Sequence, residues 1–91
     1  MINPQTTISR KEDVVVAELD GKTVMMSLNN GEYYGLDEVA TAIWNGVEQP
    51  VTVSELVSRL AKEYRVSLEQ CQADVLEFLE NLYNKQLIEI S

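Results

Sequence analysis

Histidine is absent from this chain, and cysteine occurs once, at Cys71. A serine or cysteine nucleophile normally depends on a histidine base, so the absence of histidine argues against nucleophilic catalysis. Zinc sites use several cysteine and histidine ligands, which this chain cannot provide alone. A single cysteine also excludes an internal disulfide, which fits a reducing compartment. We therefore expect a protein that is not an enzyme and that has no metal site and no cofactor.

Basic residues are also scarce. Seven Lys and Arg residues stand against fifteen Asp and Glu residues, which gives a formal net charge of -8. This charge repels phosphate backbones and anionic membrane surfaces and favours a basic or neutral partner. No apolar run approaches the roughly 20 residues that span a bilayer, and the N-terminus lacks the features of a secretory signal. We expect a cytoplasmic protein with no nucleic-acid partner and no membrane partner.

What remains is the composition of one small globular domain. Hydrophobic residues make up 45% of the 91 residues, enough for a single core but not for a second layer around a buried active site. The sequence contains no internal repeat, linker or low-complexity segment. We expect one domain over residues 1–91, with residues 1–5 disordered.

The first half of the chain has the pattern of a β-meander. Alternating and β-branched residues predict strands at Val14–Leu19, Lys22–Leu28 and Glu32–Leu36. Asp20-Gly21 tolerates the positive φ angles of a two-residue hairpin turn. Asn29-Asn30-Gly31 provides a second turn of the same chemistry. The sequence therefore predicts three antiparallel strands before the helical second half.

Three helices are expected in the second half. Asp37 can cap a helix that begins at Glu38. Thr52 and Ser67 each open a capping box, which predicts a second helix with an apolar stripe to Tyr64 and a third helix to about Tyr83. Two weaker patterns predict short strands at Thr6–Arg10 and Lys85–Ile90. The expected fold class is α+β, a three-stranded antiparallel meander followed by three helices.

A meander has two edges, and an uncovered last strand can pair with another chain. Neighbouring Tyr33 and Tyr34 point to opposite faces, so one should pack and the other be exposed. The third helix has an apolar arc wider than its seating on the core requires. The residues expected to face the core are Leu68, Gln72, Val75, Leu79 and Leu82. The first flank of this face carries Cys71, Asp74 and Phe78, and the second flank carries Leu76 and Tyr83. We take the first flank as the wall of a ligand groove; the alternative is that all these residues fill the core.

Besides capture of a peptide at the strand edge, two other functions fit a meander followed by helices. A winged-helix DNA reader would place the third helix in the major groove, but no basic residue lies between Arg65 and Lys85, and the helix carries four acidic residues. That charge is repelled by DNA. The third reading is a structural subunit that forms a homodimer through the same strand edge.

The sequence resembles the PqqD-like family of small domains that recognise the leader segment of ribosomally made, modified peptides. The resemblance runs from about Val14 to Ile90. It is carried by Leu19-Asp20-Gly21, Gly31 to Asp37, Ile43-Trp44, Thr52 to Val57 and Cys71 through Ile88. The Tyr33 to Leu36 segment, the Ile43-Trp44 pair and the run from Cys71 to Phe78 are most similar to stand-alone leader-binding proteins of lasso-peptide gene clusters.

The resemblance implies a winged helix-turn-helix-like fold and a non-catalytic adaptor. In that family a precursor leader adds as an antiparallel strand to the third strand, packs against the third helix and is presented to a separate cysteine protease or other modifying enzyme. A quinone-cofactor-type peptide chaperone that works with a radical enzyme is the alternative. The implied peptide-binding residues are Tyr33, Tyr34, Gly35, Leu36, Gln70, Cys71, Asp74, Val75 and Phe78.

Overall fold

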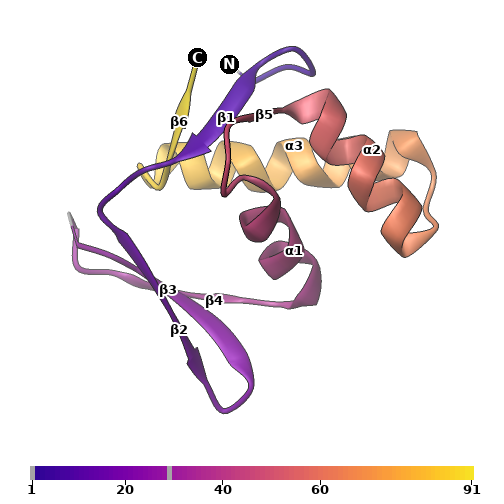
Figure 1. Ribbon diagram of the computed structural model, residues 1–91. Helices are drawn as coiled ribbons and strands as arrows, with labels where there is room; N and C mark the ends of the chain where they lie inside the picture. Colours follow the sequence, from indigo (N-terminus) through magenta and orange to yellow (C-terminus); the bar gives the residue numbers. More distant parts are fainter. Residues whose placement is uncertain (1, 29) are drawn as a thin grey trace.

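The computed structural model describes residues 2–28 and 30–91, and within them the chain forms two three-stranded antiparallel sheets and three helices (Figure 1). This arrangement confirms the α+β fold class. The elements are β1 (Thr7–Arg10), β2 (Val14–Leu19), β3 (Lys22–Ser27), β4 (Tyr33–Leu36), α1 (Glu38–Gly46), β5 (Val51–Thr52), α2 (Val53–Tyr64), α3 (Leu68–Asn84) and β6 (Ile88–Ile90).

The meander sheet, which we define as β2-β3-β4, forms as predicted. Asp20 and Gly21 join β2 to β3 with φ angles of 54° and 78°, the combination that a type I′ hairpin turn requires. The loop before β4 closes where the Gly31 N–H donates to the Ser27 carbonyl at 2.7 Å, and Gly31 has a φ of 71°. The predicted second turn includes Asn29, which lies outside the described residues.

All three predicted helix caps are present. The Asp37 carboxylate accepts a hydrogen bond from the Ala40 N–H at 2.7 Å, the Thr52 hydroxyl from Glu55 at 3.2 Å, and the Ser67 hydroxyl from Gln70 at 3.2 Å. Each cap satisfies one of the backbone donors that a helix leaves unpaired at its start. Helices α2 and α3 are joined by a tight turn in which Arg65 has a φ of 53°.

The second sheet, which we call the terminal sheet, joins segments from both ends of the chain. Strand β1 lies between β5 and β6 and pairs antiparallel with both. The two short strands predicted near the chain ends are β1 and β6, which pair with each other, and β5 was not predicted. The terminal sheet and the meander sheet lie at opposite ends of the molecule, with α1 between them (Figure 1).

The core lies between the helices and the inner faces of both sheets. Its largest fully buried side chains are Trp44, Ile8, Met25, Ile43, Leu56, Leu79, Leu87 and Ile88. The predicted core face of the third helix is wrong at its start, because Leu68 is 60% exposed and Cys71 is buried in its place. Leu68 is the first residue of α3; Cys71, Val75, Leu79 and Leu82 follow at spacings of four, four and three, so they form one stripe along the helix.

The start of the chain is packed rather than frayed from Ile2 onward. Ile2 belongs to the buried core, and its N–H donates to Glu80 Oε1 of α3 at 3.0 Å. The Ser54 N–H donates to the Pro4 carbonyl at 2.9 Å. The prediction of disorder also covers Met1, which lies outside the described residues.

Candidate functional site

Strand β4 is an edge of the meander sheet, and its backbone offers hydrogen-bonding groups along that edge. The Ser27 N–H donates to the Glu32 carbonyl at 3.1 Å, and bonded and non-bonded pairs alternate along an antiparallel ladder. The pairs Met26–Tyr33 and Val24–Gly35 are therefore the non-bonded ones. The N–H and C=O groups of Tyr33 and Gly35 consequently point away from β3, toward the open side.

The two neighbouring tyrosines have the different environments that the sequence predicted. Tyr33 is 70% exposed, whereas Tyr34 packs against the core. The Tyr34 hydroxyl donates to Glu32 Oε2 at 3.0 Å, and Lys85 Nζ lies 5.5 Å from the centroid of its ring. Burial, with the bond to Glu32, raises the pKa of Tyr34 above its usual value. Tyr34 thus ties β4 to the end of α3.

An apolar pocket of about 290 Å³ lies where α1, α2 and α3 meet. An apolar cavity of about 150 Å³ accommodates a benzene ring, whereas sites for drug-sized molecules begin near 300 Å³. The pocket therefore suits one large side chain better than a free small molecule. It is lined by Val39, Leu60, Tyr64, Val66, Cys71, Asp74 and Val75.

The pocket wall on α3 combines a buried thiol with an exposed carboxylate. Cys71 is buried, and its Sγ lies 3.7 Å from the Val57 carbonyl oxygen, to which it donates. Burial, and secondarily the negative charge of Asp74, raises the pKa of the Cys71 thiol. Cys71 is thus a small apolar wall residue rather than a reactive thiolate. Asp74 Oδ1 accepts a hydrogen bond from Gln70 Nε2 at 3.0 Å.

The structure brings only part of the predicted site together. Cys71, Asp74 and Val75 share the pocket, Gln70 reaches it through Asp74, and Phe78 is half-buried against the core. The four strand candidates, Tyr33, Tyr34, Gly35 and Leu36, do not line this pocket. Strand and helix candidates therefore form two parts, an open edge and a side-chain pocket, rather than one continuous cavity.

Sequence reasoning missed four pocket residues. Val39, Leu60 and Tyr64 belong to the apolar stripes of the first two helices, and Val66 lies in the turn that follows the second helix. Val39 and Val66 are both substantially exposed, although each is a large aliphatic side chain. The valine in the turn between the second and third helices was the signal that the sequence offered, because a loop position exposed to water does not need an apolar residue.

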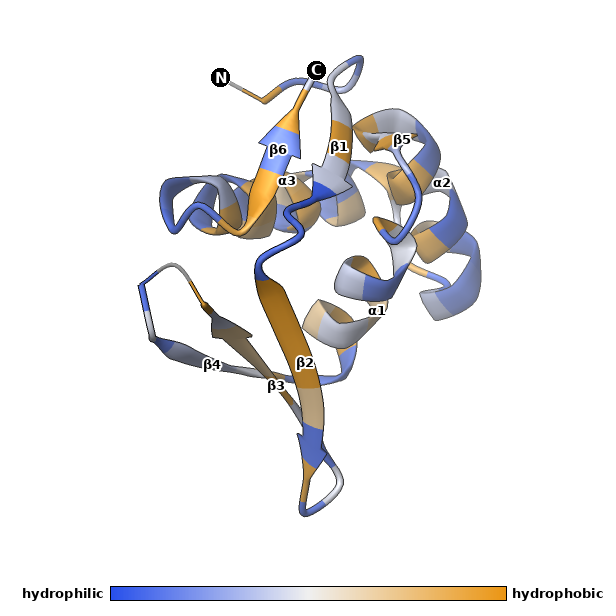
Figure 2. Cartoon of the chain, turned by 60° about the vertical axis from the view of Figure 1, so that its left-hand side comes forward, coloured by the Kyte–Doolittle hydropathy of each residue, from blue (hydrophilic) through white to orange (hydrophobic). Residues whose placement is uncertain are grey.

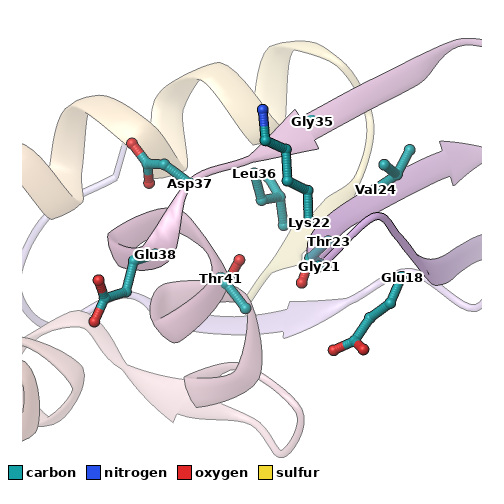
Figure 3. Close-up of a pocket in the computed structure, with 10 residues that line it drawn as sticks. All are labelled: Glu18, Gly21, Lys22, Thr23, Val24, Gly35, Leu36, Asp37, Glu38 and Thr41. Carbon is teal, nitrogen blue, oxygen red and sulfur yellow. The ribbon is translucent and has the colours of Figure 1, made fainter.

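A wider hollow opens at the end of β4, beside the β2–β3 turn, and is drawn in Figure 3. It measures about 700 Å³ and includes Gly35 and Leu36 from the strand. Lys22 and three carboxylates surround it, but Asp37 is already engaged as the cap of α1. The hollow is broad and open, so it leaves space for a chain that continues past the end of β4.

No group of three or more potential metal ligands occurs in residues 2–28 and 30–91. Within the same residues, no helix has both the length and the apolar character needed to cross a bilayer.

The fold and the open edge of β4 define the class of protein. It is a small α+β domain with an accessible edge strand and an accessible side-chain pocket between its helices. The chain belongs to the PqqD family, because the family model for coenzyme PQQ synthesis protein D (PqqD) matches residues 22–88. No curated protein matches the chain.

Three solved structures share this fold. TbiB1 in complex with the TbiA(beta) leader peptide has 34% sequence identity and a TM-score of 0.80, and the match covers 89% of this chain and 94% of TbiB1. The PqqD truncation of Methylobacterium extorquens PqqCD, a stand-alone recognition element for ribosomally synthesised and modified peptides, has 22% identity and a TM-score of 0.82, with coverage of 98% and 95%. Lasso peptide synthetase B1 complexed with the leader peptide has 20% identity and a TM-score of 0.79, with coverage of 90% and 96%.

Proposed function

We propose that this protein is a non-catalytic adaptor that binds the leader segment of a ribosomally synthesised precursor peptide. The leader pairs as an antiparallel strand with β4 and is presented to a separate processing enzyme in the cytoplasm. The observation that carries the proposal is the edge of β4, where the backbones of Tyr33 and Gly35 point away from the sheet. Backbone pairing provides affinity in this mode of binding, and side-chain pockets provide specificity.

The apolar pocket supports a specific division of roles. A leader that runs antiparallel to β4 has its N-terminal part beside Leu36, on the side of α1 and of the Val39 wall of the pocket. One apolar leader side chain fills that pocket against Cys71 and Val75. The net charge of -8 favours a leader that is neutral or basic around this anchor.

We infer a lasso-peptide pathway rather than quinone-cofactor assembly; the inference is supported by the shared fold with lasso peptide synthetase B1, whose structure also contains a leader peptide. Identity is 34% to TbiB1, whose structure contains a leader peptide, against 22% to the PqqD unit. A leader protease is therefore the partner enzyme that we propose, and the catalytic groups belong to that enzyme rather than to this chain.

Amide hydrogen exchange tests strand addition directly. In the free protein, the amides of Tyr34 and Leu36 are bonded to β3 and exchange slowly, whereas those of Tyr33 and Gly35 exchange quickly. Adding a synthetic leader of the cognate precursor should slow exchange at Tyr33 and Gly35 by about tenfold or more. Saturating leader that leaves both amides fast would rule out pairing at β4.

Asp74→Lys is expected to weaken leader binding roughly three- to tenfold, equivalent to about 0.6–1.4 kcal/mol. The substitution places an ammonium at the rim of an apolar pocket and removes the acceptor for Gln70. Titration calorimetry with the synthetic leader measures the change. Glu77→Lys is the matched control, because Glu77 is an exposed residue of the same helix that does not line the pocket. Equal losses in both variants would indicate a general charge effect and would remove Asp74 from the site.

Leader binding should also protect Cys71 from alkylation. The thiol is buried and its pKa is raised, so modification of the free protein is slow and depends on brief opening of the pocket. A bound leader side chain should slow the reaction by roughly fivefold or more, because it stabilises the closed form. Mass spectrometry reports a single site, since the chain has one cysteine. An unchanged alkylation rate at saturating leader would place the peptide elsewhere.

A further inference from the structure

The outer face of the meander sheet points away from the helices. Directly opposed residues on neighbouring strands share a face, and the inner rows include the fully buried Met25 and Ser27. The outer rows are therefore Val15–Met26–Tyr33, Ala17–Val24–Gly35 and Leu19–Lys22. In Figure 2, β2 runs along the front of this sheet and carries hydrophobic colour over most of its length.

This outer face has an unusual composition for a surface. The solvent side of an antiparallel sheet normally carries polar residues. Here Lys22 is the one charged residue among the eight positions, and no carboxylate occurs on the face of a chain with fifteen Asp and Glu residues. Exposure is high at Tyr33, Leu19 and Val15, at 70%, 59% and 45%. A contiguous apolar surface that lacks acidic residues and includes Tyr and Met is typical of an interface.

We infer that the outer face of the meander sheet is the docking surface for the processing enzyme, specifically for an apolar patch on that enzyme surrounded by basic residues. The inference rests on the proposed function, because it needs a leader bound at β4. Acidic residues flank the face at the ends of its strands, at Asp13, Asp20, Glu32 and Asp37. Charge complementarity therefore requires a basic rim on the partner.

The outer face is continuous with the strand edge. Tyr33 lies on this face, and its backbone groups belong to the open edge. A leader strand added beside β4 would extend the sheet by one strand, and every second leader side chain would lie level with Tyr33 and Met26. An enzyme docked on the face would therefore contact adaptor and leader together, so the loaded adaptor would offer a larger surface than the empty one.

The size of the face argues against a second copy of this chain as the occupant. Strands β2 and β3 have six residues each and β4 has four, so side by side they cover at most about 20 by 10–14 Å, or roughly 200–280 Å². A stable protein interface uses about 800 Å² on each partner. Two copies would also bring together two net charges of -8. A small face is sufficient for the enzyme, because a precursor held by both proteins raises their effective concentration.

The test uses Val15→Lys and Leu19→Lys, both on β2 and therefore two strands away from the leader edge. Leu68→Lys is the matched control, because it is the same substitution at equal exposure, 60% against 59% for Leu19, on a different surface. Each variant is checked for folding by circular dichroism. Three quantities are then measured: leader affinity by calorimetry, mass by sedimentation, and kcat/KM for precursor cleavage by the leader protease that the proposed function assigns as the partner.

We expect leader affinity within about twofold of the original, and kcat/KM at least about tenfold lower for Val15→Lys and Leu19→Lys but not for Leu68→Lys. Unchanged cleavage with normal leader binding overturns the docking surface alone. An original protein that is dimeric, with variants that are monomeric, overturns it in favour of a second copy. Failure of the original protein to bind leader at all overturns the proposed function, and the inference with it.

Discussion

Gly35→Pro is expected to weaken leader binding by at least about tenfold, equivalent to 1.4 kcal/mol or more. The Gly35 N–H points to the open side of β4, so proline removes a donor that strand addition uses. The proline ring also places a carbon atom where the leader backbone must approach. The fold should survive, because proline is tolerated on an edge strand when the lost N–H faces away from the ladder.

Two further variants isolate the cause of this loss. Gly35→Ala keeps the N–H, and a Cβ at this position meets no atom within 4 Å, so its affinity should stay within about twofold of the original. Tyr34→Pro removes an N–H that bonds β3 and should destabilise the meander itself. Calorimetry and circular dichroism are measured on all three. A Gly35→Pro protein that is folded and binds leader normally would exclude β4 as the docking strand.

Trp44→Ala is expected to reduce the free energy of unfolding by about 3–5 kcal/mol. Trp44 is 1% exposed in the centre of the core. Arg10 from β1 covers it, with its guanidinium carbon 4.5 Å from the ring centroid and with Nε and Nη2 donating to the Trp44 carbonyl at 3.1 and 2.7 Å. Total stability for a domain of this length is only about 5–14 kcal/mol. The substitution therefore removes a large fraction of it.

Urea unfolding followed by circular dichroism measures this loss, since the variant has no tryptophan left to report by fluorescence. The Arg10→Lys variant measures the contribution of the arginine apart from that of the tryptophan ring, because lysine keeps the charge but lacks the planar guanidinium. We expect that variant to lose about 1–2 kcal/mol. A loss below about 1 kcal/mol for Trp44→Ala would mean that the helical layer does not depend on this side chain.

Local chemistry made the meander and the helix starts predictable from the sequence. Asp20-Gly21 specifies its turn through φ angles that few other residues adopt, and Asp37, Thr52 and Ser67 each cap a helix through a bond that spans three residues. These signals lie within a few positions of one another, so no knowledge of distant contacts is needed. The edge position of β4 followed from the order of the same strands.

Two strands of the terminal sheet were predicted, but β5 and the pairing of the three strands were not, because the pairing joins segments far apart in the sequence. Ile8 pairs with Val51 on one side and with Ile90 on the other. Strand β5 has two residues, and its Thr52 is also the cap of α2, so the helix signal conceals the strand. A strand this short has no alternation of its own to detect.

The part of the candidate site that depends on local sequence patterns was predictable, and the part that depends on the packing of distant helices was not. Strand alternation separates Tyr33 from Tyr34, and helix periodicity places Cys71 and Asp74 on one flank, whereas Gly35 was implied by the family resemblance. The pocket also needs Val39, Leu60, Tyr64 and Val66, which meet only when three helices pack. Leu68 shows the limit of helix periodicity, because a first-turn residue can belong to the apolar stripe and still project past the neighbouring helix.

The position of β1 between β5 and β6 governs how the protein can be joined to others. Both chain termini lie at the side of the molecule remote from the meander (Figure 1). A tag, surface tether or fused enzyme attached at either end would therefore lie away from the meander sheet. The peptide-pairing edge would stay open in such a fusion. Immobilised protein should therefore capture peptide equally well through either terminus.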